Sequence, residues 1–221
     1  MLLSGRCELL WSAESEHEFL VRSENGSLVC AFGAADIRTV EAAALDPEVR
    51  AVLCAPENAP ALAPALTGWS LVAAVLHRLP SDFEPPPSEP AARGAILSRE
   101  DAKHLSHVPE PLRREIVDAL ESTHVAAATL EGVPVAFCYP AYETETLWDV
   151  SVDTLEPYRR RGLARTCFEF LCDHMSAHGK APVWGALAGN TASLALARRL
   201  GFEEVDRSSV FLRQGDRRLA P

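Results

Sequence analysis

The stretch from Val150 to Ala164 constrains the fold of this chain most, because a strand pattern there runs through a basic turn into a helix pattern. Apolar and polar residues alternate from Trp148 to Asp153, and a period of two predicts a strand with one buried face. Pro157 has no N–H group for a strand ladder, so the strand is expected to end before it. Apolar residues then recur at helical spacing up to about His178. The sequence therefore predicts a strand, a basic turn and a helix in succession.

The basic turn has the features of an anion-binding site. It consists of Arg159, Arg160, Arg161 and Gly162, directly before the predicted helix. The first N–H groups of a helix lack intrahelical partners and carry a partial positive charge, which attracts anions. Gly162 has no side chain, so a phosphate group can approach the backbone closely. A solvated basic loop is the alternative interpretation of the same residues.

The spacing of the turn is R-x-x-G-x-A, from Arg159 through Gly162 to Ala164. It resembles the pyrophosphate loop of the GNAT superfamily of acyl-CoA-dependent N-acyltransferases, whose motif is Q/R-x-x-G-x-G/A. A second segment, Gly189–Phe202, is similar to the N-x-x-S/A and L-G-F signatures that begin and end the next helix of that family. The resemblance covers about Arg93 to Arg213, a little over half of the chain.

The resemblance implies an α/β (α+β) fold, with a mixed, mostly antiparallel sheet flanked by helices. In the family two neighbouring strands splay apart and the pantetheine arm of the acyl-CoA lies in the gap; here these strands would be Leu147–Val152 and Pro182–Ala186. Asn190 would lie near that arm, although it can also act simply as a helix cap. The residues that the resemblance assigns to acetyl-CoA are Val150, Val152, Arg159, Arg160, Arg161, Gly162, Leu163, Ala164, Asn190 and Ser193.

Carboxylates near the motif are candidates for the catalytic base, because an amine must lose a proton before it attacks a thioester. Many GNAT proteins use a carboxylate of the strand before the turn. Asp149 and Glu145 are expected on one face of that strand, with Asp149 as the first choice and ordinary surface acids as the alternative. Asp153 is expected to be a turn residue at the strand end.

The leaving thiolate needs a proton donor, and here the chain departs from the family pattern. Many members place a tyrosine five residues before the phenylalanine of L-G-F, where this chain has Ala197. The candidates that remain are solvent, Tyr158, Tyr139 and Ser193.

Residues 1–90 predict a smaller α/β domain, either a degenerate GNAT-like half or a substrate-side cap. The proline-rich run over residues 85–90 is stiff and extended, so we place a domain boundary there, with the GNAT-like domain over residues 91–221. The first 90 residues hold 5 Lys and Arg against 13 Asp and Glu. That imbalance either attracts a cationic amine or serves solubility. Expected strands are Cys7–Ala13, Ser27–Gly33, Arg50–Cys54 and Trp69–Leu76, with a helix over Asp36–Leu45.

Composition and spacing argue against several other classes of protein. The net charge of −10 disfavours nucleic acid as the main partner. No apolar run approaches the roughly 20 residues of a membrane helix, and no signal peptide is visible. The six cysteines form no C-x-x-C pair, as in a reduced, cytoplasmic protein. His174 and His178 have a spacing that can bind zinc, but no further ligand set is evident beside them, so no metal is expected.

The resemblance implies a cytoplasmic N-acetyltransferase that transfers an acetyl or short acyl group from acyl-CoA to a primary amine by direct attack. The expected partners are acetyl-CoA, as co-substrate, and an amine acceptor, and a homodimer is left open. The alternative is a non-catalytic CoA-binding or interaction module on the same fold, favoured by the missing tyrosine.

Overall fold

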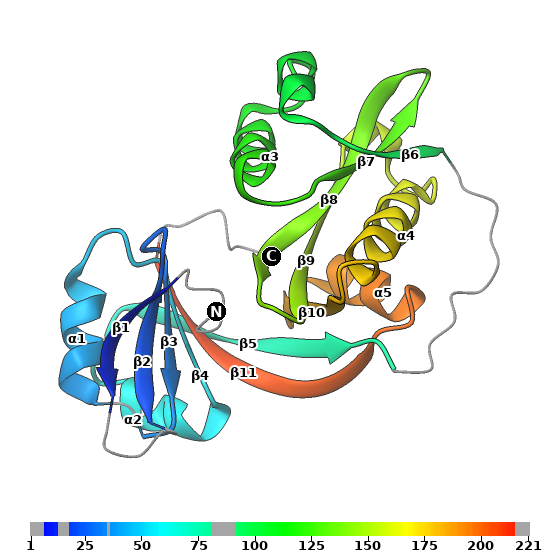
Figure 1. Ribbon diagram of the computed structural model, residues 1–221. Coiled ribbons are helices and arrows are strands. Elements are labelled where there is room, and N and C mark those ends of the chain that lie inside the picture. The colour runs from blue at the N-terminus through cyan, green and yellow to red at the C-terminus, as the bar shows by residue number, and fades with distance from the viewer. Residues whose placement is uncertain (1–6, 13–17, 35, 81–91, 215–221) are drawn as a thin grey trace. The chain divides into compact units, whose positions relative to one another are not determined.

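A computed structural model describes residues 7–12, 18–34, 36–80 and 92–214 (Figure 1). The chain divides into two compact units. The first combines Met1–Arg78 with Gly185–Pro221, and the second is Leu79–Trp184. Strand β10 (Ala181–Leu187) crosses this division, so its first residues belong to the second unit and its last residues to the first.

The helices and strands divide between the two units as follows. The first unit contains β1 (Cys7–Ser12), β2 (Phe19–Ser23), β3 (Leu28–Phe32), α1 (Ile37–Leu45), β4 (Ala51–Cys54), α2 (Ala59–Leu62), β5 (Trp69–Arg78), α5 (Thr191–Arg199) and β11 (Glu203–Arg213). The second contains β6 (Arg93–Ile96), α3 (Glu110–Ser122), β7 (Ala126–Leu130), β8 (Val133–Glu143), β9 (Leu147–Thr154) and α4 (Leu163–Ser176). Short 3-10 helices cover Pro56–Asn58, Arg99–His104 and Glu156–Tyr158.

The sheet of the first unit has the strand order β1-β2-β3-β4-β11-β5. Its pairs are antiparallel except for β3 with β4. The C-terminal strand β11 lies between β4 and β5, pairing with β5 from Glu203 to Arg213 and with β4 over its last part. Phe211 of β11 is buried in one core with apolar residues of β2, β3, β4, α1 and α2. The N-terminal sheet therefore contains a strand from the far end of the chain.

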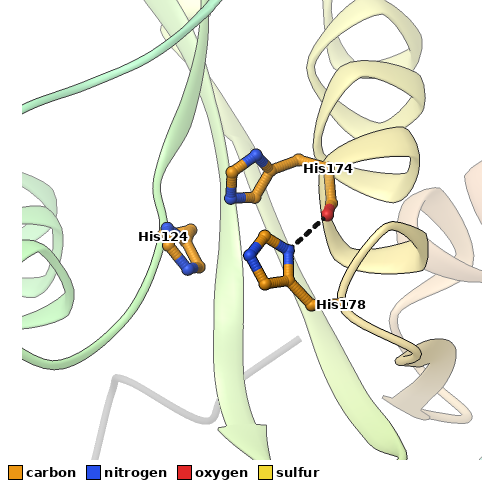
Figure 2. A group of neighbouring side chains, drawn as sticks. All are labelled: His124, His174 and His178. Atoms are coloured by element: carbon orange, nitrogen blue, oxygen red, sulfur yellow. Dashed lines mark hydrogen bonds between the residues drawn. The ribbon is translucent and has the colours of Figure 1, made fainter.

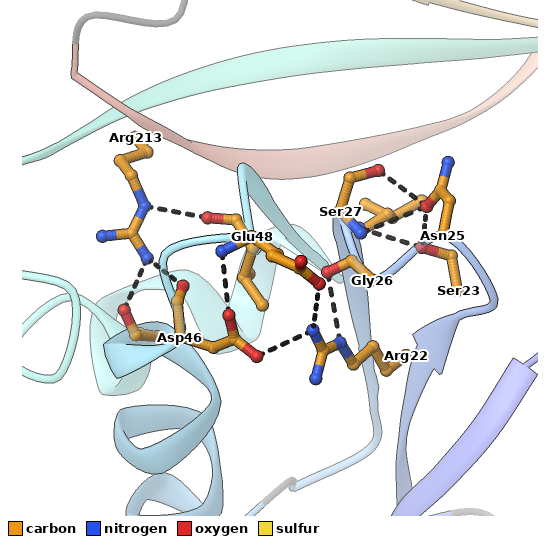
Figure 3. Close-up of polar contacts among 11 residues, drawn as sticks. Arg22, Ser23, Asn25, Gly26, Ser27, Asp46, Glu48 and Arg213 are labelled. Atoms are coloured by element: carbon orange, nitrogen blue, oxygen red, sulfur yellow. Dashed lines mark hydrogen bonds and ion pairs between the residues drawn. The ribbon is translucent and has the colours of Figure 1, made fainter.

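Arg213 ties β11 to the C-terminal end of α1 (Figure 3). Its guanidinium donates to the carbonyl oxygens of Ala44, Asp46 and Val49 at 2.6, 2.8 and 2.8 Å. The guanidinium carbon also lies 4.5 Å from the centroid of the Trp69 ring. Because the last carbonyls of a helix lack intrahelical partners, this cation completes the end of α1.

The second unit has the strand order β6-β7-β8-β9-β10, with antiparallel pairs from β6 to β9 and a parallel pair between β9 and β10. Helices α3 and α4 lie on opposite sides of β8 and β9 (Figure 1). The Trp148 ring of β9 is buried 6.2 Å from the Phe168 ring of α4, so the apolar face of β9 meets α4. Tyr139 of β8 donates its hydroxyl to Glu115 of α3 at 3.2 Å, which places the other face on the α3 side.

The structure confirms the predicted fold class, a mixed and mostly antiparallel sheet flanked by helices. One strand was missed. The expected strands Cys7–Ala13 and Ser27–Gly33 do not pair with each other, because Phe19–Ser23 forms a further strand that pairs with both β1 and β3. None of the helices in the described part of the chain is both long and apolar enough to cross a membrane.

The division into units differs from the boundary expected near residue 90. The proline run lies outside the described residues. Residues 185–221, expected in a domain over residues 91–221, group with the N-terminal residues. The reason is the ladder that β11 forms with β4 and β5, which makes it a central strand of the first unit.

Candidate functional site

Strand β9 has one edge that is only partly paired. Its ladder with β8 runs from Trp148 to Thr154, whereas its parallel ladder with β10 ends after three pairs, at Asp149 opposite Val183. Among the described residues, those from Val150 to Thr154 therefore have strand partners on the β8 side alone. An open strand edge offers backbone N–H and C=O groups to an extended ligand.

The turn after β9 places three exposed arginines between the strand and α4. The Nε atom of Arg159 donates to the carbonyl oxygen of Thr154 at 3.2 Å, which folds that side chain back over the strand end. The guanidinium carbon of Arg161 lies 5.6 Å from the centroid of the Tyr158 ring. Arg160 has a φ of 60°, which is uncommon for a residue with a side chain. The predicted basic turn therefore has a defined conformation, and it brings the positive charges of three arginines together.

Gly162 is the N-cap of α4 and has a φ of 78°, in the left-handed region that favours glycine. The first helical hydrogen bond runs from the Thr166 N–H to the Gly162 carbonyl at 3.1 Å. No side chain in the described part of the chain caps this helix end. The first N–H groups of α4, at Leu163 and Ala164, therefore face the turn without an intrahelical partner. With the neighbouring arginines, this helix start has the donors and the charge that a phosphate needs.

Ionisable side chains also meet on the α3 side of β9. Burial raises the pKa of Asp153, and the nearby Glu115 carboxylate raises it further, while the Arg159 guanidinium opposes the rise. Burial likewise raises the pKa of Tyr139, whose hydroxyl donates to Glu115. A carboxyl group with a raised pKa can exchange a proton closer to neutral pH than an ordinary aspartate can.

The predicted catalytic residues do not lie together. Asp149 is partly buried in β9, at the last pair with β10. Glu145 is exposed in the turn before β9, so the prediction that it shares a strand face with Asp149 is wrong. Mutual hydrogen bonds between Thr144 and Leu147 close that turn, so the strand begins only at Leu147. Tyr158 ends the 3-10 helix beyond the strand, beneath Arg161.

Asn190 and Ser193 belong to the first unit, at the start of α5. The Asn190 side chain accepts a hydrogen bond from the Ser193 N–H at 3.1 Å, so Asn190 does cap the helix. Ala197 is fully buried in the same helix, where its methyl group offers no proton. A role for Asn190 or Ser193 toward a cofactor stays a prediction.

Two of the ionisable residues on the α3 side of β9 were misplaced or not singled out from the sequence, Asp153 and Glu115. Asp153 was assigned to a turn, but β9 continues through Thr154, as the unbroken alternation from Trp148 could have indicated. Glu115 lies on the polar side of α3, and helical periodicity alone does not say which strand such a side meets. Cys167 of α4 is fully buried, and burial raises the pKa of its thiol to about 12.

Comparison with known sequences finds similarity to a protein family over part of the chain. Residues 126–211 match the model of the GNAT acetyltransferase family. A curated relative, the ribosomal protein bS18-alanine N-acetyltransferase of Escherichia coli, is 40% identical over 60 residues, or 27% of this chain. The match spans 39% of that relative's length.

Solved structures share the fold over nearly the whole chain. A GCN5-related N-acetyltransferase-like protein from Streptococcus suis has a TM-score of 0.70 at 17% identity, covering 94% of this chain and 89% of that one. A GCN5-related N-acetyltransferase from Kribbella flavida has a TM-score of 0.61 at 19% identity, covering 96% and 91%. At these identities the likeness shows the fold alone, and the family match rests on residues 126–211. Residues 126–211 of this chain therefore match the GNAT acetyltransferase family, on a fold that the chain shares with GCN5-related N-acetyltransferases.

Proposed function

We propose that this protein is an N-acetyltransferase that uses acetyl-CoA, or another short acyl-CoA, to acetylate a primary amine. The observation that carries the proposal is the path from the open edge of β9, through the arginine turn, to the uncapped start of α4 at Gly162. That path offers strand backbone to an amide-containing arm and, at its end, helix N–H groups to a pyrophosphate.

In this arrangement the backbone of Val150 and Val152 binds the pantetheine arm. The N–H groups of Leu163 and Ala164 bind the pyrophosphate, with the guanidinium groups of Arg159, Arg160 and Arg161 adding charge. Gly162 keeps the approach open because no Cβ stands in it. Asn190 and Ser193 remain candidates for the cofactor through the family resemblance alone.

We place the base at Asp149, because it sits at the pair where the β9–β10 ladder ends. An acyl group held along the open edge, from Val150 onward, would lie beside this carboxylate. The neutral amine attacks the thioester carbon, a backbone N–H of the strand stabilises the oxyanion, and Asp149 accepts the proton of the amine. The carbon–sulfur bond then breaks, and the CoA thiolate takes a proton from Tyr158 or from solvent.

A transfer assay that detects the free CoA thiol, with a panel of amines, tests this function. The panel includes a peptide with an N-terminal alanine, because the curated relative is named for acetylating that residue of a ribosomal protein. Asp149→Asn should lower the maximal rate by roughly 100-fold or more, the scale of a lost general base. Acetyl-CoA affinity should stay nearly unchanged, since the carboxylate does not touch the pyrophosphate.

Glu145→Gln is the matched control, because it removes an exposed carboxylate of the turn just before β9. Its rate should stay near that of the unaltered protein. Loss of rate in Glu145→Gln, with Asp149→Asn unaffected, would move the base to the turn. If neither variant slows the reaction, a carboxylate at these positions does not take the proton.

A non-catalytic CoA-binding module is the second candidate, and Ala197 favours it, because this fully buried methyl group occupies the place of the family's tyrosine. Such a module would bind acetyl-CoA and release no thiol with any amine. Thiol release above the solvent background excludes it.

A further inference from the structure

Three histidines converge at the C-terminal end of α4, the opposite end of that helix from Gly162 (Figure 2). His174 lies in the last turn of α4, His178 just beyond that helix, and His124 in the segment that enters β7. The ring centroids of His124 and His174 are 4.4 Å apart, those of His174 and His178 4.8 Å, and those of His124 and His178 5.6 Å. All three belong to the second unit, so this arrangement lies within one compact body.

Their nitrogen atoms are available as ligands. The Nδ1 atom of His178 lies 2.8 Å from the carbonyl oxygen of His174. Because a carbonyl oxygen only accepts hydrogen bonds, this contact puts the proton of neutral His178 on Nδ1 and leaves the Nε2 lone pair free. The Nε2 atom of His174 is buried and has no hydrogen-bond partner among the described residues. One ligand-capable nitrogen from each ring lies within 4.8 Å of the other two.

This cluster is costly without a ligand. A buried imidazole nitrogen without a partner loses the hydrogen bond that it makes in water. Three charged imidazoles as close together as these would repel one another. A bound cation satisfies the lone pairs of three neutral rings at once. The C-terminal end of α4 adds a partial negative charge that favours a cation there.

We propose that His124, His174 and His178 bind one Zn²⁺ ion and so join the entry of β7 to the C-terminal end of α4. In a tetrahedral site with Zn–N distances of ~2.0–2.1 Å, the ligand nitrogens lie roughly 3.3 Å apart. Small rotations of the imidazole rings would shorten the spacing between the ligand nitrogens from the 4.8 Å observed here to this value. The fourth position is left to water or an exogenous ligand.

The ligand chemistry selects the metal. Imidazole nitrogen suits zinc and its transition-metal neighbours, whereas magnesium and calcium prefer oxygen ligands. Each of the three histidines would contribute one neutral imidazole nitrogen. The site does not depend on the proposed acetyl transfer, since the residues of the two do not overlap.

The test is a titration of the untagged full chain with Zn²⁺, followed by calorimetry and by the melting temperature. We expect one Zn²⁺ per chain and a raised melting temperature, with Mg²⁺ at the same concentration having no such effect. His178→Gln and His124→Gln should each weaken Zn²⁺ binding by more than the roughly 10- to 100-fold that loss of an outer-shell partner costs. His178 is exposed, so its replacement should leave the fold intact, which circular dichroism without metal checks.

His104→Gln is the matched control, because His104 is an exposed histidine of the same unit, in the 3-10 helix Arg99–His104. It should bind Zn²⁺ as the unaltered chain does. The proposal is overturned if the chain takes up no stoichiometric Zn²⁺, if His178→Gln and His124→Gln both bind it undiminished, or if His104→Gln weakens binding equally. Acetyl-CoA binding, measured on the same variants, should be unchanged.

Discussion

Asp153 is a carboxylate held half-buried beside a second carboxylate, Glu115, with Arg159 as the opposing cation. Its folded-state pKa is raised above the ordinary value of 3.8, so the folded protein binds its proton more tightly than the unfolded chain does. This tighter proton binding stabilises the folded state. The stabilisation is fully present below the pKa that Asp153 has in the unfolded chain, and it is lost as the pH rises through the pKa in the folded protein. Asp153→Asn should therefore raise the free energy of unfolding at neutral pH and flatten its decline above about pH 4.

Denaturant unfolding of both proteins across this pH range measures the effect. Asp173→Asn, an exposed aspartate of α4, is the control and should keep the pH dependence of the unaltered protein. An Asp153→Asn variant that is less stable at neutral pH would show that the charged carboxylate is stabilised and not penalised where it lies.

At the residue scale, the sequence predicts a residue's role well when that role depends only on its neighbours along the chain. Gly162 was expected at the helix start, and its positive φ follows from that local position. Glu145 was misplaced because the start of β9 depends on the hydrogen bonds of Thr144, which an alternation pattern does not contain. The meeting of Asp153 with Glu115 depends on tertiary packing between β9 and α3.

Arg213 shows how one side chain fixes two elements. It joins the end of β11 to the last carbonyls of α1 through three hydrogen bonds and lies over the Trp69 ring. Hydrogen bonds from a charged group contribute about 1.5–3 kcal/mol each before losses from solvent contact. Arg213→Ala should lower the free energy of unfolding by about 2–4 kcal/mol, because three carbonyls lose their donor together.

Arg207→Ala on the same strand is the comparison. Arg207 is exposed and pairs with Glu204 at 2.7 Å, an ion pair of the surface kind that contributes about 0–1 kcal/mol. Equal losses of stability in the two variants, measured by denaturant unfolding, would show that the contacts of Arg213 with α1 add nothing.

At the element scale, most strands and helices could be predicted because their hydrophobic periods are local. Strand β2 was not predicted because it has only five residues, FLVRS, and follows an acid-rich stretch that resembles a loop. Its inner position between β1 and β3 buries residues on both faces, so it shows no alternation.

At the scale of the whole molecule, the sequence did not predict which strands pair across long separations. Strand β11 takes β4 and β5 as partners, although well over 100 residues separate them, and this ladder assigns residues 185–221 to the first unit. For the same reason, the sequence indicated only two of the three histidines of the cluster. The spacing of His174 and His178 can be read along one helix, whereas His124 arrives from a different segment.

The central claim is that the turn at Gly162 binds the pyrophosphate of acetyl-CoA, and calorimetric titration of the full chain with acetyl-CoA tests it most directly. Gly162→Glu puts a negative side chain at the start of α4, and Gly132→Glu is its matched control. Gly132 has a similar φ, 82° against 78°, and lies in the β7–β8 turn with open space where a Cβ would go. Both variants therefore carry the same backbone strain, but only one blocks the proposed site.

We expect Gly132→Glu to bind acetyl-CoA as the unaltered chain does. Gly162→Glu should bind at least roughly 100-fold more weakly, a loss of about 2.7 kcal/mol, because like charge would occupy the place of the phosphate. A folded Gly162→Glu variant that binds acetyl-CoA with the affinity of the Gly132→Glu control would contradict the account.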